Sequence, residues 1–519
     1  MNRESVIDEL RSSDQPWDII IIGGGATGMG TALDAASRGY RTLLIEQHDF
    51  GKGTSSRSTK LVHGGVRYLR QGDVSMVFEA LKERGLMMQN APHLVRNQSF
   101  IIPAYDWWEG PFYTIGLKVY DVMAGKMGFG PSYHISREET IKALPNIETR
   151  GLKGGIIYHD GQFDDARMLI SLGQTTRKYG GYVINYLKAT GLIKEKNLVA
   201  GVEARDEESG EEFLIRAKVV INATGVFADT ILKMDTPEAG DMIRPSQGIH
   251  LVLGEEYLKG SHAIMVPHTS DGRVMFAVPW YNRVVLGTTD TLIDKFSLEP
   301  EPLESEIDFV LETAGQYLVK KPERKDVLSA FAGLRPLAAP DSEGKSTKEI
   351  SRHHKILVSV TGLISVIGGK WTTYRKMAED ALNYAIMVGE LPEKPCITHD
   401  IKIHGYAIPN EDHINPMSVY GTERQEVESM EVAGQNILSE SLQIYPSQII
   451  WAARKEMARS LEDVLARRTR ALFLDARESM KIAPQAASLL AGELGKDKEW
   501  INAELDNYEK LLKNYLVDN

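Results

Sequence analysis

A short run of the chain combines glycines with side chains suited to acid–base and anion-binding chemistry. Residues 63–69 are His63-Gly64-Gly65-Val66-Arg67-Tyr68-Leu69, so paired glycines place a histidine, an arginine and a tyrosine close together on tightly turned backbone. Glycine pairs let a ligand approach the backbone, and histidine is the side chain best suited to proton transfer near neutral pH. A lone histidine is more often structural than catalytic, so both interpretations of His63 stay open.

A glycine-rich loop closer to the N-terminus indicates binding of a dinucleotide. Gly23, Gly25 and Gly28 follow the apolar run 18–22 and open a helical pattern. In a strand–turn–helix unit the first glycine permits the tight turn, the second lets the backbone approach a pyrophosphate, and the third packs helix against strand. The helix N-terminus offers N–H groups and a partial positive charge to the phosphates. Glu46 ends the next apolar run, where a carboxylate can accept hydrogen bonds from a ribose diol.

Other loop residues are candidates for contact with the same cofactor. The loop alone does not separate FAD from NAD, but its place at the start of a long chain favours FAD, as do the strand-end runs 222–225 and 368–370. The run 54–60 supplies hydroxyls and two cations, either as pyrophosphate and ribitol contacts or as a solvated Ser/Thr loop. The expected cofactor-binding residues are Gly23, Gly25, Gly28, Glu46, Thr54, Ser55, Ser56, Ser58, Gly225, Gly369 and Lys370.

The elements that must position these residues follow two different patterns. Apolar runs at 18–22, 42–46 and 217–223 alternate with helical patterns, which predicts an α/β domain with strand–helix–strand units. Strand-like runs between 244 and 291 are closely spaced, as in an antiparallel sheet of a substrate domain. Beyond about residue 395 the pattern is helical, and Ser460 with Asp463 resembles a capping box. We expect an FAD-binding domain in three parts (17–90, 151–235 and 331–394), a substrate and cap domain in two (91–150 and 236–330), and a helical domain (395–519).

Composition restricts the partners. With 519 residues the chain is long enough for two or three domains. A net charge of −11 argues against nucleic-acid binding, so any anionic ligand must meet a local cluster of cations. The single cysteine, Cys396, excludes an intramolecular disulfide or a cysteine-based zinc site, and we expect no metal and a cytoplasmic protein. No run reaches the roughly 18 apolar residues of a spanning helix, so any membrane contact is expected to be peripheral.

Taken together, the motifs resemble those of the FAD-dependent glycerol-3-phosphate dehydrogenase family, of the aerobic, quinone-linked type. The runs that carry the resemblance are DIIIIGGGATGMG at 18–30, TSSRSTKLVHGGVRYL at 54–69, DGQFDDARML at 160–169, INATG at 221–225, GTTD at 287–290, AGLRPL at 332–337, GGKWTTYRKMAEDAL at 368–382 and SLEDVLARRTRALFLD at 460–475. The resemblance covers the chain after its first 16 residues. It implies an α/β FAD-binding fold of the glutathione-reductase and D-amino-acid-oxidase type, with an antiparallel-sheet substrate domain and a C-terminal helical domain.

The resemblance also implies a reaction and a substrate site. The expected reaction oxidises sn-glycerol 3-phosphate to dihydroxyacetone phosphate, with hydride passing from C2 to flavin N5 and electrons then passing to a quinone. By motif match the substrate-binding residues are Arg67, Tyr68, Arg335 and Arg352, with Lys370 beside them. Arginine's planar fork pairs bidentately with phosphate, so Arg335 and Arg352 are expected to hold it. An ordinary ion pair is the alternative for Arg335, although its weakly polar surroundings at 330–334 make an unpaired guanidinium costly.

The oxidation also requires a base and a group that stabilises charge. His63 and His250 are both candidates for the general base, each with a structural role as the alternative. Lys370 and the helix N-terminus after Gly369 are expected to stabilise negative charge on the flavin.

The electron acceptor and the cellular setting leave alternatives open. An oxidase of the same fold would pass electrons to oxygen and release hydrogen peroxide, and an electron-transfer partner subunit is a third possible acceptor. A flavin-binding module or an amino-acid oxidase are more distant alternatives. Membrane-bound relatives dock through basic and apolar surface; this chain is acidic but keeps basic clusters such as 467–470. We expect the protein at the inner face of the cytoplasmic membrane. A homodimer is compatible with the sequence.

Overall fold

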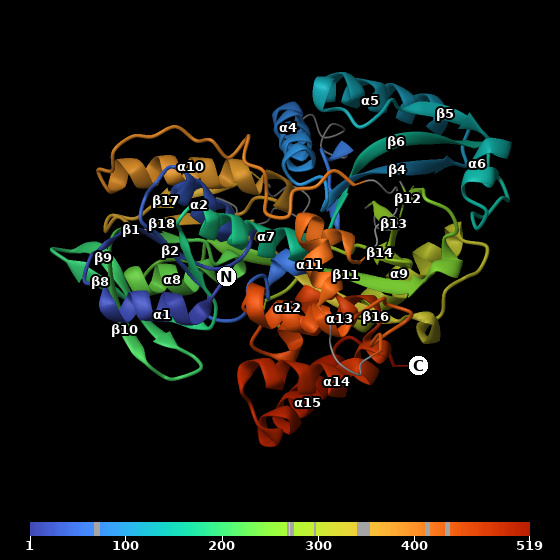
Figure 1. Ribbon diagram of the computed structural model, residues 1–519. Coiled ribbons are helices and arrows are strands. Elements are labelled where there is room, and N and C mark those ends of the chain that lie inside the picture. The colour runs from blue at the N-terminus through green and yellow to red at the C-terminus, as the bar shows by residue number, and fades with distance from the viewer. Residues whose placement is uncertain are drawn as a thin grey trace.

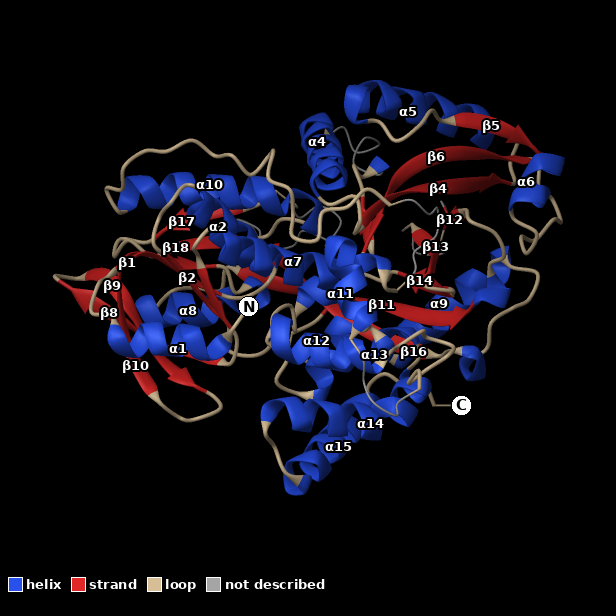
Figure 2. Ribbon diagram, viewed as in Figure 1, coloured by secondary structure: helices blue, strands red, loops and turns tan. Residues whose placement is uncertain are grey.

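Two β-sheets lie side by side in the molecule, and a C-terminal helical domain contacts one of them and a helix that covers the other (Figure 1). The computed structural model describes residues 1–66, 73–266, 269, 274–294, 297–339, 353–409, 416–430 and 436–518. In Figure 2 the strands of the eight-stranded sheet occupy the left of the molecule and those of the ten-stranded sheet the right. Among the described residues no helix is both long and apolar enough to cross a membrane.

The eight-stranded sheet carries the glycine-rich loop. Its central strand β1 pairs in parallel with β10 and β2, and the order across the sheet is β17-β18-β10-β1-β2-β7. Residues 19–22 are all buried, which is expected of a parallel strand covered on both faces. The strands are β1 (Trp17–Ile22), β2 (Thr42–Ile45), β7 (Tyr182–Ile184), β8 (Leu187–Glu195), β9 (Leu198–Asp206), β10 (Glu212–Asn222), β17 (Lys355–Val358) and β18 (Ile364–Ile367).

Helices cover this sheet on both sides. The helix that follows the glycine loop, α2, packs between α7 and α10, while α8 lies on the other side of the sheet in Figure 1. Helix α2 stops at Ser37, and Gly39 follows with φ of +75°, as is common for a glycine just beyond the last turn of a helix. The helices are α1 (Arg3–Ser12), α2 (Ala26–Ser37), α7 (Asp165–Lys178), α8 (Ala228–Asp235) and α10 (Tyr374–Val388).

The ten-stranded sheet is almost wholly antiparallel, as expected of the substrate domain. Its order is β15-β11-β14-β13-β12-β4-β6-β3, with β16 on β11 and β5 on β6. The strands are β3 (Leu61–Val62), β4 (Val95–Ala104), β5 (Tyr133–Ser136), β6 (Gly154–Phe163), β11 (Ile243–Gly254), β12 (Ala263–Val266), β13 (Met275–Trp280), β14 (Arg283–Gly287), β15 (Thr291–Leu292) and β16 (Ser329–Ala338). The helices beside it are α4 (Val74–Asn90), α5 (Glu109–Ala124), α6 (Arg137–Ala143) and α9 (Glu304–Tyr317).

Three strands differ from the domain boundaries expected from the sequence. We assigned 17–90, 151–235 and 331–394 to the FAD-binding domain, yet β3 pairs with β6, β6 pairs along its whole length with β4, and β16 pairs with β11. These three strands therefore belong to the ten-stranded sheet. The pairing partner of a strand lies far away in the chain, so a local pattern identifies the strand and not its sheet.

The C-terminal domain is helical, as expected, but its basic run at 467–470 does not lie where we expected it. Ser460 and Asp463 form the expected capping box, with each backbone N–H donating to the other residue's side chain. The basic run 467–470, which we expected to remain as a basic surface cluster, is buried, because Arg467, Arg468 and Arg470 form ion pairs with internal carboxylates. The elements are α11 (Arg424–Ser429), α12 (Pro446–Glu456), the π-helical turn η8 (Asp463–Arg468), α13 (Ala471–Leu474), α14 (Ala476–Leu494) and α15 (Lys498–Lys513).

Candidate cofactor and substrate site

Gly23 and Gly28 serve the structural purposes expected of them, and Gly25 lines a cavity. Gly23 has φ of +112°, and a Cβ there would lie 2.6 Å from the carbonyl oxygen of Ala223 on the next strand. A Cβ on Gly28 would overlap the carbonyl oxygen of Gly23, so Gly28 lets α2 pack against the end of β1. Gly25 is the N-cap residue of α2 at the wall of this cavity, and its approach to a pyrophosphate stays a prediction.

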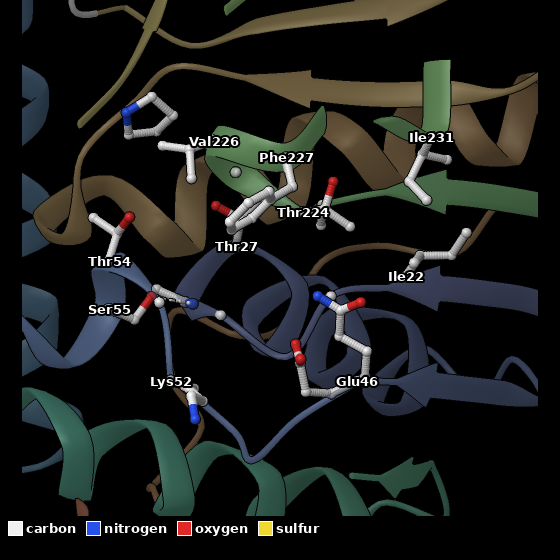
Figure 3. A pocket seen from close by; sticks show the side chains of 18 of the residues that line it. Ile22, Thr27, Glu46, Lys52, Thr54, Ser55, Thr224, Val226, Phe227 and Ile231 are labelled. Atoms are coloured by element: carbon white, nitrogen blue, oxygen red, sulfur yellow. Dashed lines mark hydrogen bonds between the residues drawn. The ribbon is translucent and has the colours of Figure 1, made fainter. Parts of the chain in front are cut away.

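That cavity, of about 350 Å³, brings together residues far apart in sequence. Figure 3 shows Ile22 at the end of β1 and Glu46 just after β2 opposite Thr224, Phe227 and Ile231. Eight of the expected cofactor-binding residues line it: Gly23, Gly25, Glu46, Thr54, Ser55, Gly225, Gly369 and Lys370. Gly28, Ser56 and Ser58 do not line it. Its elongated set of lining residues, from Glu46 to Lys370, suits a dinucleotide such as FAD.

Glu46 stands at one end of the cavity. Its Oε2 accepts a hydrogen bond from the backbone N–H of Gly24 at 2.6 Å, and its Oε1 accepts one from that of His48 at 2.9 Å. Burial raises the pKa of Glu46, and these two backbone donors act in the opposite direction. Each carboxylate oxygen has a second lone pair, so Glu46 can still accept hydrogen bonds from a ribose diol.

The two cations of the run 54–60 are buried and paired inside the protein. Arg57 pairs with Glu299 at 2.5 Å, and the fully buried Lys60 pairs with Asp165 at 2.8 Å. The Ser58 hydroxyl donates to the same Asp165, at 2.7 Å. The interpretation as a solvated loop is therefore wrong for these two cations, because internal carboxylates neutralise them, and contact of the run with the pyrophosphate and ribitol stays a prediction.

Ser55 and Trp371 close the cavity where α2 begins. The Ser55 hydroxyl accepts a hydrogen bond from the N–H of Ala26 at 3.0 Å, and the Nε1–H of Trp371 donates to the Ser55 carbonyl at 2.8 Å. Trp371 belongs to the motif at 368–382, but the sequence did not indicate its contact with Ser55. Gln47, Lys188 and Phe227 also line the cavity, and no sequence signal pointed to them.

Lys370 marks the opposite end of the cavity. It precedes the 3-10 turn η6 (Trp371–Thr373) that leads into α10, so the expected helix N-terminus follows it directly. The half-buried Lys370 has its Nζ 2.8 Å from Sδ of Met76. A cation and a helix N-terminus at one place can stabilise an anion.

The run 63–65 lies against this end of the cavity. The backbone N–H of His63 donates to the hydroxyl of Thr372 at 3.3 Å, which joins the run to η6. The backbone N–H of Gly64 donates to Oη of Tyr120 at 2.8 Å. Arg67 and Tyr68, which we expected to bind substrate, lie outside the described residues.

His250 is buried in the ten-stranded sheet. Its ring stacks on Phe331 with centroids 4.9 Å apart, and its Nε2 lies 2.9 Å from Oγ1 of Thr59. Its Nδ1 has no hydrogen-bond partner among the described residues. Burial, reinforced by the charges of Lys60 and Arg335, lowers the pKa of His250 well below 6.5, so the imidazole is neutral at physiological pH.

Arg335 lies on β16 beside His250's strand and is 23% exposed. Its guanidinium donates to the Thr289 carbonyl at 2.9 Å and lies 3.4 Å from Oδ1 of Asp290. A Cβ on Gly248 would overlap this guanidinium, so Arg335 depends on a glycine in the adjacent strand. Arg352, the other expected phosphate ligand, lies outside the described residues. The described part of the chain contains no group of three or more metal-ligating side chains.

Comparisons with known proteins agree with this geometry. Residues 18–375 match the family described as FAD dependent oxidoreductase, and residues 359–501 match the C-terminal domain of alpha-glycerophosphate oxidase. The mitochondrial glycerol-3-phosphate dehydrogenase of Bos taurus is 38% identical over 98% of this chain and 75% of its own. The Arabidopsis thaliana mitochondrial enzyme of that name is 37% identical over 99% of this chain and 88% of its own. A glycerol-3-phosphate dehydrogenase from Bacillus halodurans, solved with FAD, superposes with a TM-score of 0.80 at 29% identity, covering 99% of this chain and 97% of that one.

Proposed function

The chain belongs to the FAD-dependent glycerol-3-phosphate dehydrogenase family, and on that premise we propose that it oxidises sn-glycerol 3-phosphate to dihydroxyacetone phosphate. The observation that carries the proposal is the convergence of four distant segments on one cavity. The glycine loop, Glu46, Gly225 and Lys370 all line it. Bound FAD supplies the hydride acceptor for this oxidation.

The substrate is proposed to bind next to the Lys370 end of the cavity. We assign Arg335 and Arg352 to the phosphate of the substrate. Arg67 and Tyr68 are assigned to the same site. Asp290 offsets part of the Arg335 charge, so a phosphate dianion needs more than one cation in a protein of net charge −11. An amino-acid carboxylate needs only one, and this difference favours the phosphorylated alcohol.

The C2 hydroxyl must lose its proton as hydride leaves, and two histidines remain candidates for the base. His250 is neutral and has an Nδ1 without a partner in the described part of the chain, which supports a role as proton acceptor. Its strongly lowered pKa makes it a weak base, and this favours His63, which lies beside η6 and Lys370. A comparison of flavin reduction rates in His63 and His250 variants will identify the histidine that accepts the proton.

A quinone is the proposed electron acceptor, and an exposed apolar helix supports it. Exposed apolar side chains lie on α5 and at its N-cap: Trp108 at the cap, and Phe112, Ile115, Val119 and Val122 on the helix. Their spacing of four, three, four and three residues places them on one face. Ile115 is 69% exposed and Val122 81%, and the preceding Trp107 is 84% exposed. Helix α5 lies at the outer edge of the molecule in Figure 1.

We assign this face of α5 to the surface of a lipid membrane. Aromatic and aliphatic side chains enter the boundary between headgroups and acyl chains, and the exposed Lys118 and Lys126 beside them suit anionic headgroups. A membrane-dissolved quinone would then be within reach of the enzyme. The location that follows is the inner face of the cytoplasmic membrane. Oxygen as acceptor, with release of hydrogen peroxide, is the competing proposal.

Anaerobic mixing of the FAD-loaded protein with glycerol 3-phosphate tests the proposed oxidation. The flavin absorbance near 450 nm should bleach with this substrate and not with glycerol or with an amino acid. An unbleached flavin would contradict the proposed activity. Reoxidation of the bleached flavin then separates the acceptors: a faster reaction with a soluble quinone analogue supports the dehydrogenase, and a faster reaction with oxygen, with peroxide formed, supports the oxidase.

A further inference from the structure

One side of the cofactor cavity is formed by a segment with little regular structure. The segment comprises residues 46–57, which follow β2, and within it Glu46, Gln47 and residues 51–55 line the cavity. Its regular structure is the three-residue 3-10 turn η1 (Thr54–Ser56). A loop of this kind needs contacts from neighbouring elements to keep one conformation.

The C-terminal domain supplies such contacts through Asp49. This residue is fully buried and lies within the segment but not in the cavity lining. Oδ2 of Asp49 accepts hydrogen bonds from Nε of Arg467 at 2.5 Å and from Nη1 of Arg468 at 2.6 Å, and Oδ1 accepts one from Nη2 of Arg468 at 2.8 Å. Burial acts to raise the pKa of Asp49, but the charges of Arg468 and Arg467 outweigh it and lower the pKa to about 2. The carboxylate is therefore ionised wherever the protein is folded at ordinary pH.

Two further contacts join the same segment to the C-terminal domain. Nζ of Lys52, a cavity-lining residue whose amino end turns away from the other labelled side chains in Figure 3, lies 2.7 Å from Glu462. Glu462 in turn pairs with Arg467 at 2.6 Å. At the far end of the segment, Arg57 donates to Oη of Tyr515 at 3.2 Å. Three positions of the segment are thus held from one domain.

The local shape of the C-terminal domain explains how two consecutive arginines reach one carboxylate. Residues Asp463–Arg468 form a π-helical turn, in which the N–H of Thr469 donates to the Val464 carbonyl at 2.9 Å. Such turns are rare and occur frequently at functional sites. The start of the turn is held by the capping box at Ser460 and by Glu504, which accepts the N–H of Leu461 at 2.7 Å.

We propose that the C-terminal helical domain is part of the FAD site: Arg467 and Arg468 act as positioning residues that hold the segment 46–57 against the end of the cofactor bound at Glu46. The inference rests on FAD binding and not on the identity of the substrate. It gives the helical domain a role in cofactor retention, because residues that never touch FAD determine the position of those that do.

FAD titration of the deflavinated protein tests this role. Arg468→Lys keeps the charge but loses the bidentate fork, and we expect its Kd for FAD to rise about 10- to 100-fold. Glu462→Gln, at a partly exposed position, is the gentler second variant, with an expected rise of about 3- to 10-fold. The matched control is Arg470→Lys, an equally buried arginine of the same run that pairs with Asp164, which does not line the cavity. The control should leave Kd within about twofold while lowering the melting temperature of the apoprotein as much as Arg468→Lys does.

ADP and FMN locate the effect within the cofactor. ADP carries the part that meets Glu46 and should lose affinity in Arg468→Lys by the same factor as FAD, whereas FMN binding should not change. An unchanged Kd for FAD in Arg468→Lys and Glu462→Gln would overturn the proposal. An equal loss of FAD in the Arg470→Lys control would also overturn it, since the arginines would then act only on general stability. Failure of flavin bleaching by glycerol 3-phosphate would leave these binding results intact.

Discussion

Oη of Tyr120 lies 2.8 Å from the backbone nitrogen of Gly64 and 2.8 Å from Oδ2 of Asp160. Tyr120 lies on the buried face of α5, opposite the exposed apolar stripe, and Gly64 follows His63 in the turn beside Lys370. Arg84 completes the cluster with an ion pair to Asp160 at 2.6 Å. The buried Tyr120 hydroxyl therefore joins the turn at Gly64 to α5, a helix that does not line the cofactor cavity.

Removal of the Tyr120 hydroxyl should slow the reaction more than it weakens binding. In Tyr120→Phe the Gly64 N–H loses its nearest acceptor, a change of about 1–3 kcal/mol, and we expect the rate of flavin reduction to fall about tenfold with KM nearly unchanged. Stopped-flow spectroscopy of flavin reduction measures this rate. Tyr158→Phe removes an equally buried hydroxyl, whose partner is Met265, and serves as the control. Equal rates in the two variants would exclude a positioning role for Tyr120.

The phosphate role of Arg335 predicts a change in KM. Arg335→Ala should remove a charge-assisted contact worth about 1.5–3 kcal/mol and raise KM for glycerol 3-phosphate about 10- to 150-fold. Gly248→Ala keeps the charge but displaces the guanidinium, so we expect an increase in the same direction. Arg324→Ala, which breaks exposed ion pairs with Glu304 and Asp308, is the control and should change KM little. An unchanged KM in Arg335→Ala would refute the assignment.

The two histidines are distinguished by the rate of flavin reduction. Loss of the base should lower this rate about 10²- to 10⁴-fold, so either His63→Asn or His250→Asn should show a loss of that size while the other shows little. Burial lowers the pKa of His250, and the wild-type rate should therefore stay level as the pH falls through 6.5 if His250 is the base. Small losses in both variants would mean that neither histidine accepts the proton.

The ion pairs of Asp49 predict that the free energy of unfolding falls in acid. Its pKa is about 2 in the folded protein against an ordinary value of 3.8, so its ion pairs stabilise the fold fully above pH 4 and this contribution disappears as the pH falls through 2. This difference in pKa corresponds to about 2 kcal/mol of unfolding free energy. Urea unfolding of wild type and Asp49→Asn at several pH values measures it: the difference in unfolding free energy should be large at pH 7 and shrink below pH 4. A difference independent of pH would show that the Asp49 charge is not the cause.

The α5 face predicts binding to lipid vesicles. Ile115→Glu and Val122→Glu each remove apolar surface worth about 1.5–3 kcal/mol on burial, so co-sedimentation with anionic vesicles should fall at least about tenfold. Bleaching of the flavin by glycerol 3-phosphate should be unaffected, because these side chains are exposed away from the cavity. Leu214→Glu on β10 alters an equally exposed apolar residue and should bind vesicles like wild type. Undiminished binding in both α5 variants would place membrane contact elsewhere.

The sequence alone determined the features that depend on neighbours in the chain. The strand–turn–helix unit of the glycine loop and the capping box at Ser460 were both predicted and are both confirmed, because each is a local arrangement of backbone and side chain within a few residues. Eight of the expected cofactor residues reach one cavity because strand ends of a parallel sheet meet at the same edge.

Only the tertiary structure decided where the charged side chains lie. Arg57, Lys60 and the run 467–470 look alike in sequence whether they face solvent, a cofactor or a buried carboxylate. Their partners, among them Asp49 and Asp165, lie far away in the chain. The burial of a charge depends on long-range packing that supplies a counter-charge, and no local pattern encodes it. For the same reason the sheet to which β6 and β16 belong, and the hydrogen bond from Gly64 to Tyr120, became visible only in the folded molecule.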